Sequence, residues 1–243
     1  MKTDLAEYYE AIDHTWPAAN RWNAGAWIVR DGAGGGKRVS AATLARPSSV
    51  FDLRQAESEM SGIQQDPLFM VREGEAVLDA HLEEAGYEIV DPVNIYAAPV
   101  GSMARDTPPR LSAFDLWPPL AIQDEIWAEG GIGLARLEIM HRAEGPKTAL
   151  FGRHEGRPAA TGFIAIHNGI AMIHALEVLS AFRRQGVGRN LTRHAALWAQ
   201  NHSASTIAVL CTTANLAANA LYRSMGYSRQ GGYHYRALKK GAR

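Results

Sequence analysis

Residues 183–188 form a short, glycine-bearing turn between an apolar segment and an amphipathic one. Residues 170–178 are apolar enough for a buried strand. Residues 189–201 place Leu191 and Trp198 on one face of a helix. A strand, a helix and a strand follow at residues 206–212, 216–225 and 227–238. This order predicts an α/β (α+β) fold with mixed strand pairing, since a helix after the turn permits a crossover connection.

The chain is expected to fall into two halves. Its 243 residues lie between one and two domains at about 150 residues per domain. Proline-bearing tracts predict a linker over residues 99–119, between an N-terminal half at 1–98 and a C-terminal half at 120–243. A helix ending in Gly86-Tyr87 parallels one ending in Gly226-Tyr227. We interpret this as a duplicated half, although the same junction also arises independently.

Periodicity predicts further elements in both halves. In the N-terminal half these are strands at 26–30, 39–44, 68–72, 87–90 and 93–97 and helices at 51–64 and 75–85. In the C-terminal half these are helices at 123–128 and 134–143 and an antiparallel pair at 147–152 and 160–166.

The charge balance limits the classes of ligand. Lys and Arg number 25, as do Asp and Glu, so the formal net charge is zero. A neutral chain has no overall positive field to hold nucleic acid or an anionic membrane. The N-terminal segment carries acids where a signal peptide needs an apolar stretch, and no apolar run reaches the roughly 18 residues of a membrane span. We therefore expect a cytoplasmic protein that binds neither nucleic acid nor membranes.

Cysteine and histidine give no sign of a disulfide or a metal site. Cys211 is the single cysteine and lies in an apolar stretch, which favours a core residue over a nucleophile and a reducing compartment over an oxidising one. The nine histidines lack metal-ligand spacing, since His194 and His202 stand two helical turns apart without a third partner. The sequence thus predicts no metal.

The glycine turn has the features of an anion site. Because Gly186 and Gly188 carry no Cβ where the chain enters the helix, nearby backbone N–H groups are open to a diphosphate. These groups belong to Gln185, Gly186, Val187, Gly188 and Arg189. Arg183, Arg184 and Arg189 would add charge-assisted hydrogen bonds. The alternative is a plain tight turn whose arginines are solvated.

Two sequence blocks resemble the paired signature of the GNAT superfamily of acyl-CoA-dependent N-acetyltransferases. Residues 183–188, which follow Leu176-Glu177-Val178, are similar to that family's Arg/Gln-x-x-Gly-x-Gly/Ala loop. Residues 215–227 are similar to its Asn-x-x-Ala-x-x-x-Tyr-x-x-x-Gly-Phe/Tyr element. The resemblance covers residues 120–238. The N-terminal half is similar only in outline and lacks a Gly-x-Gly loop, as a degenerate repeat would.

The resemblance implies a mixed, mostly antiparallel sheet flanked by helices. It also implies acetyl-CoA as cosubstrate, no metal, and a primary amine of a small molecule or peptide as acceptor, joined directly in a ternary complex. The oligomeric state is open, and a homodimer is one option.

The resemblance also assigns roles to residues that would contact the cosubstrate. Backbone groups of Leu176 and Val178 would bind the pantetheine amides as an added strand does, and the Val178 N–H would polarise the thioester carbonyl. Tyr222 would act as general acid near the CoA sulfur; the alternative is an aromatic side chain packed on the sheet. Asn215 resembles the family's CoA-contacting Asn, and it is equally suited to capping a helix.

An attacking amine must be neutral, so the reaction needs a proton acceptor. Glu177 and His174 are the candidates, and three residues apart in a regular strand they would point to opposite faces. We choose Glu177, with a surface ion pair as its alternative role. His174 is expected to be a satisfied strand residue.

Two other classes of function stay open. A non-catalytic CoA-binding or sensing module would hold the diphosphate without turnover. A protein-interaction module would dock a partner through Trp16, Trp22 and Trp27, although packing in a core or between domains also explains these tryptophans.

Overall fold

The computed structural model describes residues 3–239, which pack as two compact units. Within the described residues the first unit comprises 3–16, 95–211 and 215–230, and the second comprises 17–94, 212–214 and 231–239. The expected halves at 1–98 and 120–243 differ from these units at both ends of the chain. Helix α1 (Leu5–Thr15) packs in the first unit, and the end of β11 (Ser228–Ala237) pairs with β4 (Leu68–Arg72) in the second.

The first unit is built on a mixed sheet. Besides β11, the strands of this sheet are β5 (Glu88–Pro99), β6 (Ala113–Leu116), β7 (Lys147–His154), β8 (Arg157–His167), β9 (Ile170–Val178) and β10 (Thr206–Thr212). β6, β7, β8 and β9 pair antiparallel in succession, whereas β9 and β10 are parallel. The predicted mixed, mostly antiparallel sheet is confirmed. β6 lies within the segment expected to be a linker, so residues 99–119 do not form a simple connection.

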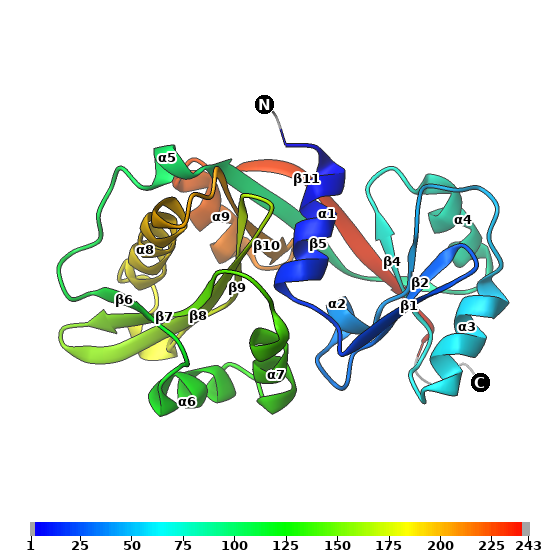
Figure 1. Cartoon of the computed structure of the whole chain (residues 1–243), viewed down its shortest axis with the longest axis horizontal. Helices are drawn as coiled ribbons and strands as arrows, with labels where there is room; N and C mark the ends of the chain where they lie inside the picture. Colours follow the sequence, from blue (N-terminus) through cyan, green and yellow to red (C-terminus); the bar gives the residue numbers. More distant parts are fainter. Residues whose placement is uncertain (1–2, 240–243) are drawn as a thin grey trace. The chain divides into compact units, whose positions relative to one another are not determined.

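Helices cover both faces of this sheet (Figure 1). They are α5 (Val100–Met103), α6 (Ala121–Glu129), α7 (Leu134–Arg142), α8 (Val187–Asn201) and α9 (Leu216–Ser224), with a 3₁₀ turn at Ser180–Phe182. α8 and α9 share a hydrophobic core with Ile164 and Ile173. The neighbouring Phe163 faces the other side, where it packs against Trp16, because strand side chains alternate. No helix within residues 3–239 combines the length and apolar character that a membrane crossing requires.

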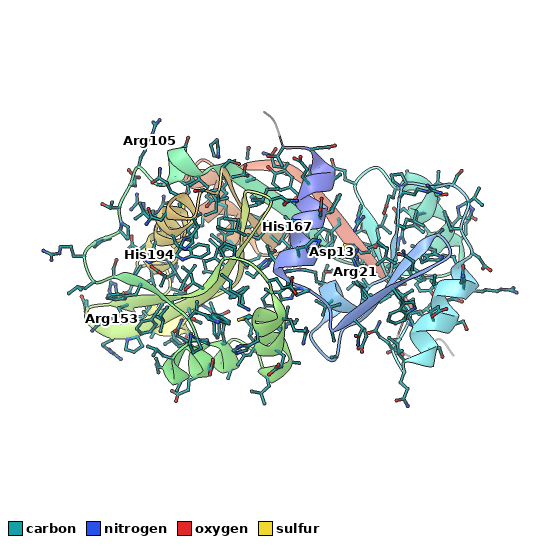
Figure 2. All side chains as sticks on the ribbon, viewed as in Figure 1. Asp13, Arg21, Arg105, Arg153, His167 and His194 are labelled. Carbon is teal, nitrogen blue, oxygen red and sulfur yellow. The ribbon has the colours of Figure 1, made fainter. Side chains whose placement is uncertain are left out.

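Local sequence explains several of these elements. Glu155 and Gly156 both have positive φ, at 48° and 78°, so they form the two-residue turn that suits a β7–β8 hairpin. β6 has no comparable sequence signal. None of its residues is fully buried, so the strand does not need the apolar alternation that marks a buried strand. Its position is fixed instead by contacts with other elements. β7 pairs with it, and Nε2 of His194 in α8 lies 2.8 Å from Oδ1 of Asp115 in β6 (His194 is labelled in Figure 2).

The second unit has its own core. Its elements are β1 (Asn20–Ala24), β2 (Trp27–Asp31), α2 (Lys37–Ser40), β3 (Thr43–Leu44), α3 (Leu53–Gly62), β4 and α4 (Ala76–Glu84). Trp27, Phe69 and Leu82 are fully buried in it. The predicted strand at 39–44 is wrong over its first part, because the chain makes a helical turn at Lys37–Ser40. The two strands predicted at 87–90 and 93–97 are one strand, β5.

Helices α4 and α9 end in the same way. Gly86 and Gly226 follow them with φ of 85° and 91°. The N–H of Tyr87 then donates to Leu82 O at 2.9 Å, and that of Tyr227 to Tyr222 O at 3.1 Å. Glycine is favoured at both positions because the left-handed conformation carries no Cβ penalty. Leu82 therefore stands in the same position before Gly86 as Tyr222 does before Gly226.

A partly buried cluster of charged side chains links β11 to α4 within the second unit. Asp79 Oδ1 accepts from Arg236 Nε and lies equally close to His234 Nε2, both at 2.7 Å, and Arg236 also donates to Tyr87 O at 2.9 Å. Burial acts to raise the pKa of Asp79, but the hydrogen bonds from Arg236 and His234 prevail and hold it below its usual range. The Asp79 carboxylate is therefore expected to stabilise the fold while it is ionised.

We expect Asp79→Asn to lower the free energy of unfolding at pH 7 by about 1–3 kcal/mol, because a charge-assisted hydrogen bond to a buried guanidinium is lost. A depressed carboxyl pKa contributes stability above the unfolded pKa and loses it as pH falls through the folded one. The difference from the wild type should therefore shrink below about pH 4. Urea unfolding at pH 7 and pH 3 measures this, with the exposed Asp66→Asn as control. Equal stability of wild type and Asp79→Asn at pH 7 would contradict it.

Candidate functional site

Strand β9 contains an extra residue that bends its end. Thr161 of β8 is opposite Glu177 and Phe163 is opposite His174, so two steps on β8 match three on β9. Ala175, within this bulge, has a φ of 48°. Because Thr161 and Phe163 share a face of β8, Glu177 and His174 also share a face of β9. The expectation that these two side chains point to opposite faces is wrong, since it assumed a regular strand.

The bulge is held from α6. The indole Nε1 of Trp127, a fully buried side chain, donates to Ala175 O at 2.8 Å. This bond satisfies a carbonyl that the disturbed ladder leaves without a regular strand partner. Trp127 carries no sequence signal for this role, because neither its spacing nor its type distinguishes it from other core residues.

Beyond the bulge, β9 and β10 part. Their parallel pairing runs from Ile170–Ile173 against Thr206–Val209 and stops there. On the other edge, Leu179 N–H donates to Ala159 O at 3.0 Å, so the adjacent pair of Ala160 and Val178 is a pair without mutual hydrogen bonds. The backbone N–H and C=O of Val178 therefore point away from β8, toward the edge that β10 has left. The carbonyl accepts from Arg183 Nε at 3.0 Å.

The glycine turn leads directly into α8. Gly186 takes the left-handed conformation with φ 81°, and no side chain caps the helix. The first backbone bond across the cap is from Asn190 N–H to Gly186 O at 3.0 Å. Among the described residues, no acceptor is found for the backbone N–H groups of residues 185–189. The N-terminus of α8 thus has the open amides that an anion needs.

The two glycines of the turn are required for different reasons. Gly186 needs its freedom for a positive φ. A Cβ on Gly188 would make ordinary contacts, at 3.6 Å from both Val178 Cγ2 and Leu221 Cδ2. These distances also show that the N-terminus of α8, the end of β9 and α9 meet at this point.

The flanking polar side chains are placed differently from one another. Arg183 Nη2 lies 3.1 Å from Glu177 Oε1, so its guanidinium is turned toward β9. Arg189 Nη2 donates to Ser224 Oγ at 2.8 Å, and Gln185 Nε2 to Ala181 O at 3.0 Å. Arg184 makes no hydrogen bond or ion pair with the described residues. Of the three arginines, Arg184 alone has its guanidinium uncommitted to the described protein.

Asn215 begins α9. Its side-chain oxygen accepts from Ala218 N–H at 3.1 Å, which is the capping role named as its alternative. Asn219, 2% exposed, donates to Asn215 O at 2.7 Å and accepts from the Tyr96 hydroxyl at 3.0 Å. Cys211 is buried beside them, and burial raises the pKa of its thiol, as the expected core residue requires.

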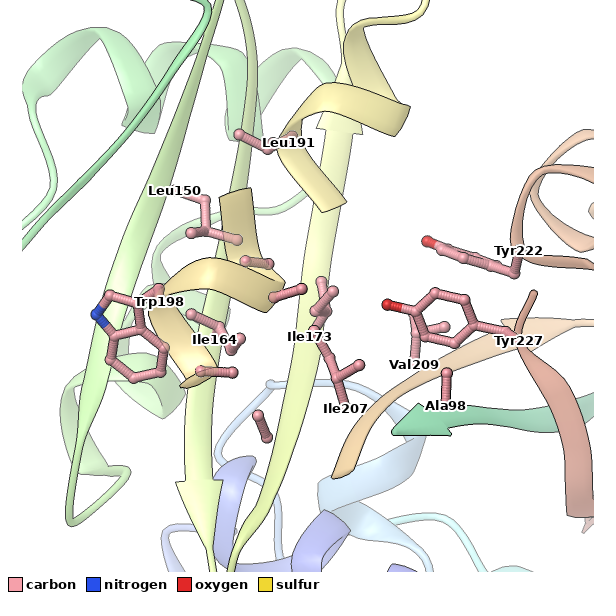
Figure 3. Close-up of a cluster of buried hydrophobic side chains, with 14 of the residues drawn as sticks. Ala98, Leu150, Ile164, Ile173, Leu191, Trp198, Ile207, Val209, Tyr222 and Tyr227 are labelled. Atoms are coloured by element: carbon pink, nitrogen blue, oxygen red, sulfur yellow. The ribbon is translucent and has the colours of Figure 1, made fainter. Parts of the chain in front are cut away.

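Two tyrosine hydroxyls lie on the α9 side of this junction. Tyr222 is 4% exposed and Tyr227 is 3% exposed, with ring centres 5.7 Å apart. Burial raises the pKa of each phenol well above its ordinary value. Figure 3 shows both hydroxyl groups on the side of the rings that faces β9. Tyr227 is not among the site residues predicted from sequence, because the motif accepts Phe or Tyr at this position. The presence of Tyr instead of Phe is the signal that could have identified it.

The opposite face of β9 carries the candidate bases. Glu177, whose side chain is 21% exposed, pairs with Arg183. It also packs on the α6–α7 turn so closely that a Cβ on Gly130 would lie 2.6 Å from its Cγ. His174 is 3% exposed, and its Nε2 lies 2.8 Å from Thr15 Oγ1. This is the satisfied strand residue expected for His174.

A histidine cluster on the first unit was invisible in the sequence. Glu10 Oε1 lies 3.2 Å from His167 Nε2, and the rings of His14 and His167 stack at 3.9 Å with 2° between their planes. Parallel rings direct their in-plane lone pairs alongside each other, whereas a metal needs them to converge. We assign no ion to this cluster.

The model of the acetyltransferase (GNAT) family matches residues 113–227, which contain the glycine turn, Glu177, Asn215 and Tyr222. The chain is 24% identical to the uncharacterized N-acetyltransferase YobR of Bacillus subtilis, over 96% of this chain and 98% of YobR.

Solved structures extend the likeness to both units. A GCN5-related N-acetyltransferase from Kribbella flavida has a TM-score of 0.75 at 20% identity, over 99% of this chain and 98% of that one. A tandem GNAT protein from the clavulanic acid biosynthesis pathway has a TM-score of 0.64 at 11% identity, over 89% and 78%. The fold is therefore that of GNAT proteins, including tandem ones. Residues 113–227 are thus similar to the GNAT acetyltransferase family, whose model they match.

Proposed function

We propose that this protein transfers an acetyl group from acetyl-CoA to the primary amine of a small molecule or peptide, by direct attack within a ternary complex. The observation that carries the proposal is the meeting of three elements at one point. The open N-terminus of α8, the parted end of β9 and the Tyr222 helix adjoin there. Each supplies a group that acyl transfer from a CoA thioester needs.

The cosubstrate fits the backbone groups present. The amides of residues 185–189 and the positive end of α8 suit the diphosphate, and Arg184 is available to add charge. The edge of β9 at Leu176 and Val178 suits the pantetheine amides, which would bind as an added strand. The Val178 N–H then lies at the far end of this edge, where it would donate to the thioester carbonyl oxygen as negative charge develops on it.

Proton movements are assigned to two side chains. Glu177 accepts a proton from the attacking amine, either directly or through water, and Arg183 holds its carboxylate in place. Tyr222 donates its proton to the sulfur as the carbon–sulfur bond breaks. Because burial keeps the phenol protonated at neutral and mildly alkaline pH, Tyr222 is in its acid form when the reaction begins.

The proposal is tested by calorimetric titration of acetyl-CoA, followed by release of free thiol with a panel of amines. Binding with thiol release supports the transferase. Binding without release from any amine supports a non-catalytic CoA-binding module instead. Absence of binding by folded protein contradicts the proposal.

We expect Gly188→Ala to weaken CoA binding without lowering the stability of the fold, if the diphosphate binds at this turn. Alanine is better than glycine inside a helix by about 0.5–1 kcal/mol, and its Cβ meets nothing closer than 3.6 Å in the protein. It would, however, stand between the backbone and the diphosphate. We expect the melting temperature to hold or rise while the Kd for CoA increases at least about tenfold. Gly62→Ala, in α3 of the other unit, is the matched control and should leave the Kd unchanged.

Tyr222→Phe removes the proposed acid. No described residue bonds this hydroxyl, so unfolding should be unaffected. We expect kcat to fall about ten- to a thousandfold, within the range of general acid catalysis. Steady-state thiol release measures it, and an unchanged kcat would remove Tyr222 from the mechanism.

Glu177→Gln removes the proposed base. The variant should turn over about a hundredfold more slowly than the wild type and should lose the pH dependence that a general base gives the rate. The pH–rate profile measures both effects. Glu129→Gln, an exposed carboxylate on the neighbouring end of α6, should behave as the wild type. Superimposable profiles for Glu177→Gln and wild type would exclude Glu177 as the base.

A further inference from the structure

The hydroxyl of Tyr227 is buried and unsatisfied within the described part of the chain. Its oxygen is buried and finds no hydrogen-bond partner among residues 3–239. A phenylalanine would fill the same space without that unsatisfied group, and leaving a buried polar group unpaired costs folding free energy. The hydroxyl therefore acts against stability as the protein stands.

The equivalent tyrosine of the second unit makes the contrast plain. Tyr87 follows α4 as Tyr227 follows α9, and its hydroxyl donates to Glu57 Oε1 at 2.6 Å. In that unit Leu82 stands where the first unit has Tyr222. The hydroxyl at this position is thus satisfied by the protein where the neighbouring phenol is missing, and left open where that phenol is present.

We propose that the Tyr227 hydroxyl donates a hydrogen bond to the reacting thioester of bound acyl-CoA, beside Tyr222. This inference rests on the proposed function. The two rings adjoin, and both hydroxyls are on the side facing β9, the strand whose parted edge would receive the pantetheine (Figure 3). The site thereby presents two phenolic donors to one group.

The two phenols have different roles: Tyr222 transfers a proton, and Tyr227 donates a hydrogen bond. As the amine nitrogen forms its bond to the carbonyl carbon, the carbon–sulfur bond breaks and Tyr222 gives its proton to the sulfur. The amine gives up a proton to Glu177, so the products are an amide and a free thiol. Tyr227 keeps its own proton and only donates a hydrogen bond. That donor lowers the cost of negative charge on the departing group in apolar surroundings, where an isolated charge is expensive.

The test is Tyr227→Phe, with Tyr87→Phe as the matched control. Thermal unfolding, steady-state thiol release, and calorimetric titration with acetyl-CoA and with desulfo-CoA, which lacks the sulfur, are measured for each. We expect Tyr227→Phe to melt at or above the wild-type temperature, with kcat about ten- to a hundredfold lower. It should also lose most of the wild-type preference for acetyl-CoA over desulfo-CoA. Tyr87→Phe should melt lower and keep the wild-type kcat and preference.

The outcomes separate the two proposals. If the wild type binds acetyl-CoA and Tyr227→Phe matches it in kcat and in both dissociation constants, the role of Tyr227 is overturned and the proposed function stands. If Tyr227→Phe melts well below the wild type at unchanged kcat, the hydroxyl is structural and the inference also fails. If the folded wild type binds no acetyl-CoA, the proposed function is contradicted, and this inference is contradicted with it because it rests on that function. The affinity ratio needs no acceptor amine.

Discussion

The extra residue in β9 is the constraint on which the site depends. If β9 were regular, its parallel pairing with β10 would continue past Ile173, and the backbone of Val178 would be used within the sheet. The bulge at Ala175 ends that pairing and turns the strand. Its positive φ is unfavourable for alanine, and the hydrogen bond from Trp127 to the Ala175 carbonyl helps to offset this. A buried indole on α6 thus decides which backbone groups are open to a ligand.

The two units use one local design for different ends. Each has a helix that ends in glycine and a buried tyrosine before a long strand. In the first unit the preceding turn of the helix carries Tyr222, and an open glycine turn begins α8. In the second unit Leu82 takes the tyrosine's place, and Asp79 pairs with Arg236 and His234. Polar groups that are left open in one copy are satisfied by the protein in the other, so the proposed chemistry belongs to the first unit.

Much of the site could be found from sequence because its parts are local. The strand at 170–178, the strand at 206–212, the start of α9 at Leu216 and its glycine stop are where the pattern predicted them. Elements that depend on distant partners were missed or misread. β6 exists because β7 pairs with it, and the segment before β3 turns helical although it was predicted as strand. The relation of His174 to Glu177 was wrong because a bulge changes the strand period without a sequence mark.

By itself, the sequence determined the class of fold, the glycine turn and the order of the two motif blocks, since these follow from periodicity and backbone preferences within short segments. Only the tertiary structure decided what those segments do together. It paired Arg183 with Glu177, used the Asn215 side chain as a cap, and enclosed Tyr222 and Tyr227 side by side. It also placed α1 and the end of β11 in different units. Burial and hydrogen-bond satisfaction depend on residues far apart in the chain, and no local pattern encodes which polar groups end up paired and which stay open.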